Sequence, residues 1–232
     1  MKETAPKPTN KLSGIITDFS DLTEDDLVRG HWENDTLNLG TVTATIAPDK
    51  GVDGSQALAA CRTEWYTQSW HNNMEVKWHL DESGLLGENK YLVVWMDLAT
   101  NNVDFRKASF GLFTDGALTG PYRTDDLEIA SAGAIGSYYY KADGSDTWVE
   151  MKMVKDNCLG YGDADSQGDL LAGCKGYFAF PIDDMYSGTL GLNSTSMITG
   201  VYFYMSYLSS DMVGKPVYVD NVQLVTDYNT VQ

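Results

Sequence analysis

The sequence predicts an all-β fold, an antiparallel β-sandwich of about ten strands with little helix, and three features predict it. Segments in which apolar and polar residues alternate recur along the chain, and each is ended by turn-forming residues. Glycine is frequent, with 22 residues in 232, while charged residues make up only 21%, which favours many turns over long helices. The 43% hydrophobic share is enough for one sizeable core.

In the first half of the chain, four segments are expected to be strands. Residues 41–47 (TVTATIA) alternate threonine with apolar residues and end at a Pro-Asp-Lys-Gly turn. Residues 54–66 begin from a Gly-Ser turn, and residues 74–80 alternate charged side chains with Met, Val, Trp and Leu. Residues 90–100 (KYLVVWMDLAT) form the most apolar strand.

The second half continues the pattern with six more candidate strands: residues 108–116, 137–144, 147–154, 176–182, 199–208 and 216–225. The only helical signal is in residues 20–30, where Ser20 could cap a single turn. We expect one domain over residues 13–226. Residues 1–12 are expected to be a linker or a tail left by expression, and residues 227–232 a linker to a following module.

The charge of the chain excludes several classes of partner. Sixteen basic against 33 acidic residues give a formal net charge of −17. Such a surface repels nucleic acid, anionic lipid and acidic glycans, because binding their anionic groups needs clustered Lys and Arg. No apolar run approaches the roughly 18 residues of a membrane span, so no membrane insertion is expected. The charge suits a secreted protein with a neutral ligand.

The stretch Thr63–Asn73 (TEWYTQSWHNN) joins aromatic rings to neutral polar side chains without an aliphatic residue. A sugar ring has an apolar face, which an aromatic ring can cover, and hydroxyls at its edge, which polar side chains can bond. This pattern makes Trp65, Tyr66, Trp70 and His71 candidate carbohydrate-binding residues. In the alternative interpretation, the tryptophans pack inward and the rest is an ordinary loop.

A second aromatic group, Tyr138, Tyr139 and Tyr140, precedes a glycine-rich turn. Neighbouring side chains in a strand point to opposite faces, so at most two of the three can share a surface. One core tyrosine flanked by two edge residues explains the pattern as well as carbohydrate binding does.

Several segments together resemble a known family: TDFSDL, GVDGSQALAA, GYFAFPIDDM and VYVDNVQLV. In this series the chain is similar to the jelly-roll, galactose-binding-like carbohydrate-binding modules of bacterial proteins that degrade polysaccharides or lie at the cell surface. The resemblance implies an extracellular, non-catalytic module without a required cofactor. It also implies a possible structural calcium, for which the matching positions are Asp18, Asp21 and Asp220, with oxygen ligands of the kind calcium prefers.

In such modules a glycan commonly lies on the concave face of a sheet. The side chains on the more polar face of residues 90–100 are candidates for that position, and Tyr204 could join them: Tyr91, Trp95, Asp97 and Tyr204. The alternative is that a loop covers Trp95, because tryptophans are mostly buried.

The predicted function is binding of a neutral plant glucan, by a monomeric module within a larger secreted or cell-surface protein. Two aromatic residues at an angle, such as Trp65 and Trp70, suit a curved, starch-like α-glucan, which is slightly preferred; a row along a sheet, such as Tyr91, Trp95 and Tyr204, suits a flat β-linked glucan. The alternatives are a jelly-roll glycoside hydrolase or lyase, and an adhesin-like module that binds protein. No catalytic motif is present in the sequence, so we expect no enzyme activity.

The cysteines leave one question open. Cys158 and Cys174 bracket a polar, glycine-rich stretch and could form a disulfide in an extracellular protein, whereas Cys61 reads as a small core residue. Spacing alone does not decide between a bridged and an unbridged pair.

Overall fold

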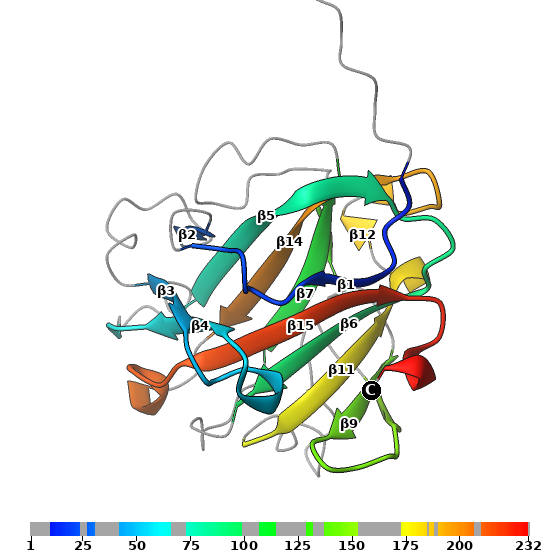
Figure 1. Cartoon of the computed structure of the whole chain (residues 1–232). Helices are drawn as coiled ribbons and strands as arrows, with labels where there is room; N and C mark the ends of the chain where they lie inside the picture. The colour runs from blue at the N-terminus through cyan, green and yellow to red at the C-terminus, as the bar shows by residue number, and fades with distance from the viewer. Residues whose placement is uncertain are drawn as a thin grey trace, which may run out of the picture.

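A computed structural model describes residues 10–23, 27–30, 42–65, 73–98, 107–114, 129–131, 137–152, 173–184, 186–187, 190–206 and 210–231. Over these ranges the chain forms two antiparallel sheets that pack face to face, as Figure 1 shows. This is the predicted antiparallel β-sandwich. None of the helices in these ranges is long and apolar enough to cross a membrane.

One sheet has eight strands in the order β10-β9-β11-β6-β15-β4-β3, with β1 also paired to β15. Its strands have the following bounds: β1 Gly14–Thr17, β3 Val42–Ala47, β4 Ala57–Arg62, β6 Tyr91–Asp97, β9 Ser137–Ala142, β10 Val149–Lys152, β11 Lys175–Pro181 and β15 Val217–Val225. Strand β6 pairs with β11 on one side and with β15 on the other, so it lies in the middle of the sheet (Figure 1). Both pairs are antiparallel.

The other sheet has seven strands in the order β13-β12-β8-β7-β14-β5-β2. Their bounds are β2 Leu27–Gly30, β5 Asn73–Leu85, β7 Lys107–Thr114, β8 Ile129–Ser131, β12 Tyr186–Ser187, β13 Leu190–Gly191 and β14 Met197–Ser206. Within the described residues, short 3-10 turns connect or end strands at Val52–Gly54, Ile182–Asp184, Ser210–Met212 and Tyr228–Thr230.

The core lies between the two sheets and follows from the alternation of the strands. Leu92, Val94 and Met96 of β6 point into it and are fully buried. Phe110 of β7 and Phe180 of β11 bring rings from opposite sheets to 5.7 Å in a stacked arrangement. Burial of these large apolar side chains is the main force that holds the sheets together.

A second apolar cluster lies on the other side of the eight-stranded sheet. It contains Val93 and Trp95 of β6, Tyr177 and Ala179 of β11 and Val225 of β15, all of which alternate with core residues on the same strands. We call this side, turned away from the seven-stranded sheet, the outer face. Among the described strands, none packs on this face as a second sheet, so its apolar cluster distinguishes this side of the molecule.

The structure corrects the sequence expectations at several elements. Leu27–Gly30, at the end of the range with the helical signal, pair with β5 as strand β2. Residues 24–26 lie outside the described residues, so the single turn capped by Ser20 stays a prediction. The short strands β1, β8, β12 and β13 were not expected, since runs of two to four residues carry little periodicity. Cys174 is a free thiol. Cys158, the other cysteine of the possible disulfide, lies outside the described residues.

Candidate functional site

The register of two strands assembles the first part of the site. Strands β6 and β11 pair so that Lys175 lies opposite Asp97 and Tyr177 opposite Trp95. Residues two apart on a strand share a face, and directly opposed residues have side chains close enough to interact. This register therefore places two aromatic rings and an oppositely charged pair next to one another on the outer face.

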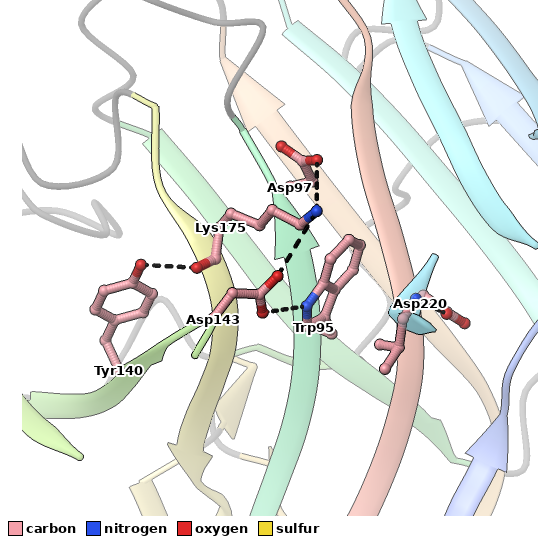
Figure 2. Close-up of polar contacts among 7 residues, drawn as sticks. Trp95, Asp97, Tyr140, Asp143, Lys175 and Asp220 are labelled. Atoms are coloured by element: carbon pink, nitrogen blue, oxygen red, sulfur yellow. Dashed lines mark hydrogen bonds and ion pairs between the residues drawn. The ribbon is translucent and has the colours of Figure 1, made fainter. Parts of the chain in front are cut away.

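Trp95 is the centre of this group. Its side chain is only 1% exposed, and its indole Nε1–H donates a hydrogen bond of 2.9 Å to Oδ1 of Asp143. The ammonium group of Lys175 lies 5.3 Å from the centre of the indole ring. The same Lys175 Nζ is 3.7 Å from a carboxylate oxygen of Asp97 and 3.7 Å from one of Asp143. Figure 2 shows Lys175 between the two carboxylates, with Asp143 also reaching the indole.

A tight turn holds Asp143 in this position. The chain reverses after β9 at Ala142–Ser145, where the Ser145 N–H donates to the Ala142 carbonyl and Gly144 has a φ of +76° that favours glycine. The Asp143 N–H donates to the carbonyl of Lys175 at 2.9 Å. The Tyr140 hydroxyl donates to the same carbonyl at 3.0 Å (Figure 2). These bonds fix the backbone that carries both charged partners.

A hollow of about 540 Å³ opens above these residues. Its lining joins the loop between β3 and β4 to the ends of β6, β9 and β11, and consists of Asp49, Lys50, Gly51, Val52, Asp53, Gly54, Trp95, Asp97, Asp143, Gly144, Lys175 and Tyr177. Two aromatic rings therefore lie among four carboxylates and two ammonium groups. Asp49 and Asp53 both have positive φ, of 58° and 53°, a backbone conformation that costs energy outside glycine and is often kept at functional sites.

Asp220 of β15 fixes the loop that forms one wall of the hollow. Its carboxylate accepts hydrogen bonds from the Val52 N–H at 2.8 Å and from the Ser55 hydroxyl at 2.6 Å. Burial raises the pKa of this carboxyl group above its ordinary value, while the same hydrogen bonds oppose the rise. The bulge that follows gives Asn221 a φ of 48°, and its side-chain amide donates to the Tyr177 hydroxyl at 2.8 Å.

A group of three aromatic side chains lies further along the outer face. Tyr91 of β6 and Tyr139 of β9 have ring centres 6.2 Å apart in an edge-to-face arrangement, and Trp148 packs against the same cluster. We call Tyr91, Tyr139 and Trp148 the aromatic platform. The ring of Tyr228 contacts all three of these side chains.

The predicted loop site falls mostly outside the described residues. Tyr66, Trp70 and His71 lie there, so their prediction stays a prediction. Trp65 is described and is 37% exposed, but it is not among the residues that line the hollow.

The three consecutive tyrosines divide between the two faces of β9. Tyr138 is fully buried in the core between the sheets, so it has no surface to offer a ligand. Tyr140 also packs against the core, where burial raises the pKa of its hydroxyl. Tyr139 belongs to the outer face, as the alternation of the strand requires.

The candidates grouped with the central strand are separated by the structure. Tyr91, Trp95 and Asp97 all lie on β6 in the eight-stranded sheet. Tyr204 was expected beside them, but it belongs to β14 in the seven-stranded sheet. That grouping is therefore wrong. The cause is that pairing between strands distant in sequence is set by the whole fold, and the alternation within one strand carries no information about it.

Of the carboxylates matched to a calcium site, Asp18 lies near enough to Asp220 for its charge to raise the pKa of Asp220. Asp18 and Asp21 line a smaller hollow of about 200 Å³, which Asp220 does not line. The Asp220 oxygens already accept three hydrogen bonds from Val52, Ser55 and Asn221. In the described part of the chain, no group of three or more His, Cys, Asp or Glu side chains could hold a metal ion. The calcium site at Asp18, Asp21 and Asp220 therefore stays a prediction.

Sequence reasoning missed several residues of the hollow. Lys175 and Tyr177 alternate with buried residues in KGYFAFP, so the period of two could have placed them on one face. The pairing of β11 with β6 makes Lys175 and Tyr177 neighbours of Trp95. No local pattern in the sequence indicates this pairing. From the sequence, Asp143 could be recognised only as part of a turn. Residues 49–54 could be recognised only as the segment that follows a strand.

The geometry determines what the hollow can do chemically. Trp95 and Tyr177 are only 1% and 6% exposed, so their rings offer almost no face for stacking. The carboxylate and ammonium groups around them can bond hydroxyls as acceptors and donors. The four carboxylates outnumber the two ammonium groups, which disfavours a ligand with its own negative charge. A neutral, hydroxyl-rich ring compound meets these requirements.

No family model and no curated protein matches the chain. Among solved structures, the chain is similar to the carbohydrate-binding module CBM28, described as specific for non-crystalline cellulose, with 15% identity and a TM-score of 0.41 over 96% of this chain and 99% of that one. It is also similar to the family 11 carbohydrate-binding module from Clostridium thermocellum in complex with a β-1,3-1,4-mixed-linked tetrasaccharide, with 12% identity and a TM-score of 0.40 over 94% of this chain and 97% of that one.

A third similar structure is the CBM22-2 xylan-binding domain of Paenibacillus barcinonensis Xyn10C. It has 12% identity and a TM-score of 0.38, over 91% of this chain and 98% of that one. Identities and TM-scores as low as these do not indicate what this chain binds.

Proposed function

We propose that this chain is a non-catalytic carbohydrate-binding module that binds a neutral glucan on the outer face of its eight-stranded sheet. The observation that carries the proposal is the hollow in which Trp95 and Tyr177 lie among Asp49, Asp97 and Lys175 and three further charged residues. Such a site binds without breaking a bond, mainly through hydrogen bonds to hydroxyls, because Trp95 and Tyr177 expose almost no ring face. Its affinity is modest, because the hydroxyls must leave water before they bond to protein.

The position of the aromatic residues bears on the shape of the glucan. Tyr91 and Trp95 lie on β6, Tyr177 lies on the neighbouring strand β11, and Tyr139 lies on β9, one strand further. A row of rings along a sheet suits an extended, β-linked chain. The preference for a starch-like α-glucan rests on Trp65 and Trp70, of which Trp70 lies outside the described residues, so both linkages belong in the test.

Location and assembly complete the proposal. A neutral polysaccharide is an extracellular ligand, so we place the module outside the cell, secreted or attached to the surface, as a monomeric part of a larger protein. The formal charge of −17 supports a neutral rather than an acidic ligand.

Native gel electrophoresis through embedded polysaccharides tests the proposal. The gels contain soluble starch, mixed-linkage β-glucan, xyloglucan, mannan or xylan, each with calcium or with a chelator. We expect retardation in a glucan gel and no release of reducing sugar from the same polysaccharide. The chelator arm tests the calcium prediction. Free migration in every gel would remove the glucan proposal, and release of reducing sugar would replace it with a glycosidase.

A pair of variants locates the site. Asp143→Ala removes a carboxylate at the hollow that also holds the Trp95 indole and Lys175, and we expect it to weaken binding about tenfold or more. Asp146→Ala is the matched control, because this exposed carboxylate is on the same turn and does not line the hollow. Equal retardation of the two variants would move the site elsewhere.

A further inference from the structure

The end of the described chain folds back onto the outer face. After β15 ends at Val225, residues 227–231 make a compact turn, in which the Asp227 carboxylate accepts hydrogen bonds from the N–H and the side-chain amide of Asn229 at 3.0 and 2.8 Å. We call residues 227–231 the C-terminal turn. Figure 1 marks the end of the chain beside β9, the strand that carries Tyr139.

The ring of Tyr228 occupies the aromatic platform. It stacks on Tyr139 with ring centres 4.4 Å apart and planes inclined by 21°. It meets Tyr91 and Trp148 edge to face, at 4.9 and 5.0 Å. A flat ring stacked on one aromatic side chain and edged by two others is in the position that a sugar ring takes in a carbohydrate site.

Val231 places the turn between the platform and the hollow. Its side chain is 5% exposed and packs in the cluster with Trp95 and Tyr177. The Val231 carbonyl accepts a hydrogen bond of 2.7 Å from Lys141 Nζ. That same ammonium group lies 5.3 Å from the Trp148 ring and 5.2 Å from the Tyr177 ring, so Lys141 links the platform to the hollow.

The spacing of the two parts indicates what could span them. Tyr91 and Trp95 are four residues apart on one face of β6, which corresponds to about 13 Å along the strand. A ligand that reaches from Tyr91 to the hollow over Trp95 must be longer than a disaccharide. A longer chain that leaves the hollow over Tyr177 meets the C-terminal turn.

In the described part of the chain, side-chain contacts and one side-chain hydrogen bond attach the turn to the sheet, and no strand pairing does. The contacts found for it on the sheet are the Tyr228 ring, the Val231 side chain and the Lys141 hydrogen bond, while Asp227 and Asn229 bond to one another within the turn. The turn can therefore leave as a unit without breaking strand pairing, since β15 ends before it.

We propose that the aromatic platform is a second carbohydrate subsite for neutral glucans longer than a disaccharide, and that Tyr228 occupies it until such a chain displaces the C-terminal turn. The proposal rests on the proposed function, because it extends the ligand from the hollow. A short ligand fills the hollow without moving the turn. A long ligand can bind to the platform only in those molecules whose turn is displaced. Its apparent affinity is therefore its intrinsic affinity multiplied by the fraction of such molecules.

Titration calorimetry of the full chain tests this with cellobiose and cellohexaose, and with maltose and maltohexaose in parallel. Tyr228→Ala removes the ring that competes for the platform, so we expect the affinity for the bound hexaose to rise about three- to tenfold. The affinity for the matching disaccharide should not change. Tyr228→Phe is the matched control, because it keeps the stacked ring, and it should behave as the wild type. Adding Tyr139→Ala to Tyr228→Ala should abolish the gain.

If Tyr228→Ala does not fold, Val231→Ala is a second test of the proposal. This variant loosens the turn and leaves the platform rings intact. It should also raise the affinity for the hexaose. An unchanged or lower affinity of the loosened variants for the hexaose, with the wild type still binding it, would overturn the second subsite alone. If the wild type and every variant bind neither hexaose, the proposed function itself fails.

Discussion

Trp95 belongs both to the buried cluster of the outer face and to the lining of the hollow. Its ring is buried in the outer-face cluster, so replacing it would create a cavity and would also remove the donor that holds Asp143 at the edge of the hollow. Its charged neighbours Asp143 and Lys175 are far more exposed, with side-chain exposures of 41% and 45%. Substitutions of these two neighbours separate binding from folding better than a substitution of the tryptophan.

Replacement of Lys175 should change stability little. Lys175→Met removes the ammonium group between Asp97 and Asp143 and keeps an unbranched side chain over the indole. Exposed ion pairs contribute little, so we expect a loss of less than about 1 kcal/mol in the free energy of unfolding. Urea denaturation measures it. A loss above about 2 kcal/mol would show that the ion pairs are structural, and the hollow would then be a less convincing ligand site.

Gly51 should tolerate no side chain. A Cβ atom there would overlap the Asp220 carboxylate, the Gln56 carbonyl and the Ser55 hydroxyl. We expect Gly51→Ala to lower the free energy of unfolding by about 1–3 kcal/mol, as overpacking does, measured by urea denaturation. Gly54→Asn in the same loop is the control, because it has open space and Asn tolerates a positive φ. Equal losses for the two variants would contradict the tight loop.

At the scale of elements, the pairing of β6 with β11 makes the site, and the sequence could reach only part of this. Alternation within residues 90–100 correctly separated Tyr91, Trp95 and Asp97 from the core side chains of the same strand. It could not show that β11 is the neighbour of β6, or that Tyr204 lies in the other sheet. Alternation is a local property, whereas strand order depends on contacts between distant segments.

The C-terminal turn illustrates the same limit. The sequence Asp227–Gln232 is polar and short, and it was expected to be a linker. In the structure, Tyr228 stacks on Tyr139 and Val231 is buried. Two apolar side chains among polar residues give no periodicity, so only the presence of the aromatic platform explains why this segment is ordered against the sheet.

The hydrogen bonds within the C-terminal turn lower the pKa of one carboxyl group, that of Asp227. The N–H of Asn229, followed by its side-chain amide, holds the pKa of the Asp227 carboxyl below its ordinary value. A carboxyl group whose pKa is lowered by folding stabilises the folded state at pH values above its ordinary pKa. That contribution to stability is lost as the pH falls through the lowered pKa. Acid should therefore loosen the C-terminal turn.

Titration of the Asp227 carboxyl carbon by NMR checks this prediction. Asn229→Ala removes the side-chain donor but keeps the backbone donor, so it should return the pKa only part of the way to its ordinary value. A wild-type pKa at or above the ordinary value would contradict the capped turn.

On the scale of the whole molecule, aromatic packing joins the two sheets. Phe110 of β7 stacks with Phe203 of β14 at 4.7 Å and with Phe180 of the opposite sheet at 5.7 Å. All three side chains are fully buried. Phe110→Ala should lower the free energy of unfolding by about 3–5 kcal/mol, because it leaves a cavity between the sheets. A loss below about 1 kcal/mol in urea denaturation would contradict this packing.

The central claim is that a neutral glucan occupies the hollow on the outer face, and the indole resonance of Trp95 tests it most directly. Its Nε1–H donates to Asp143 at the edge of the hollow, and Trp95→Phe identifies the signal in an amide-correlation NMR spectrum. We predict that addition of cellohexaose or maltohexaose shifts this resonance in proportion to occupancy. Saturable binding that leaves the Trp95 resonance unmoved and shifts only residues of the seven-stranded sheet would contradict the account.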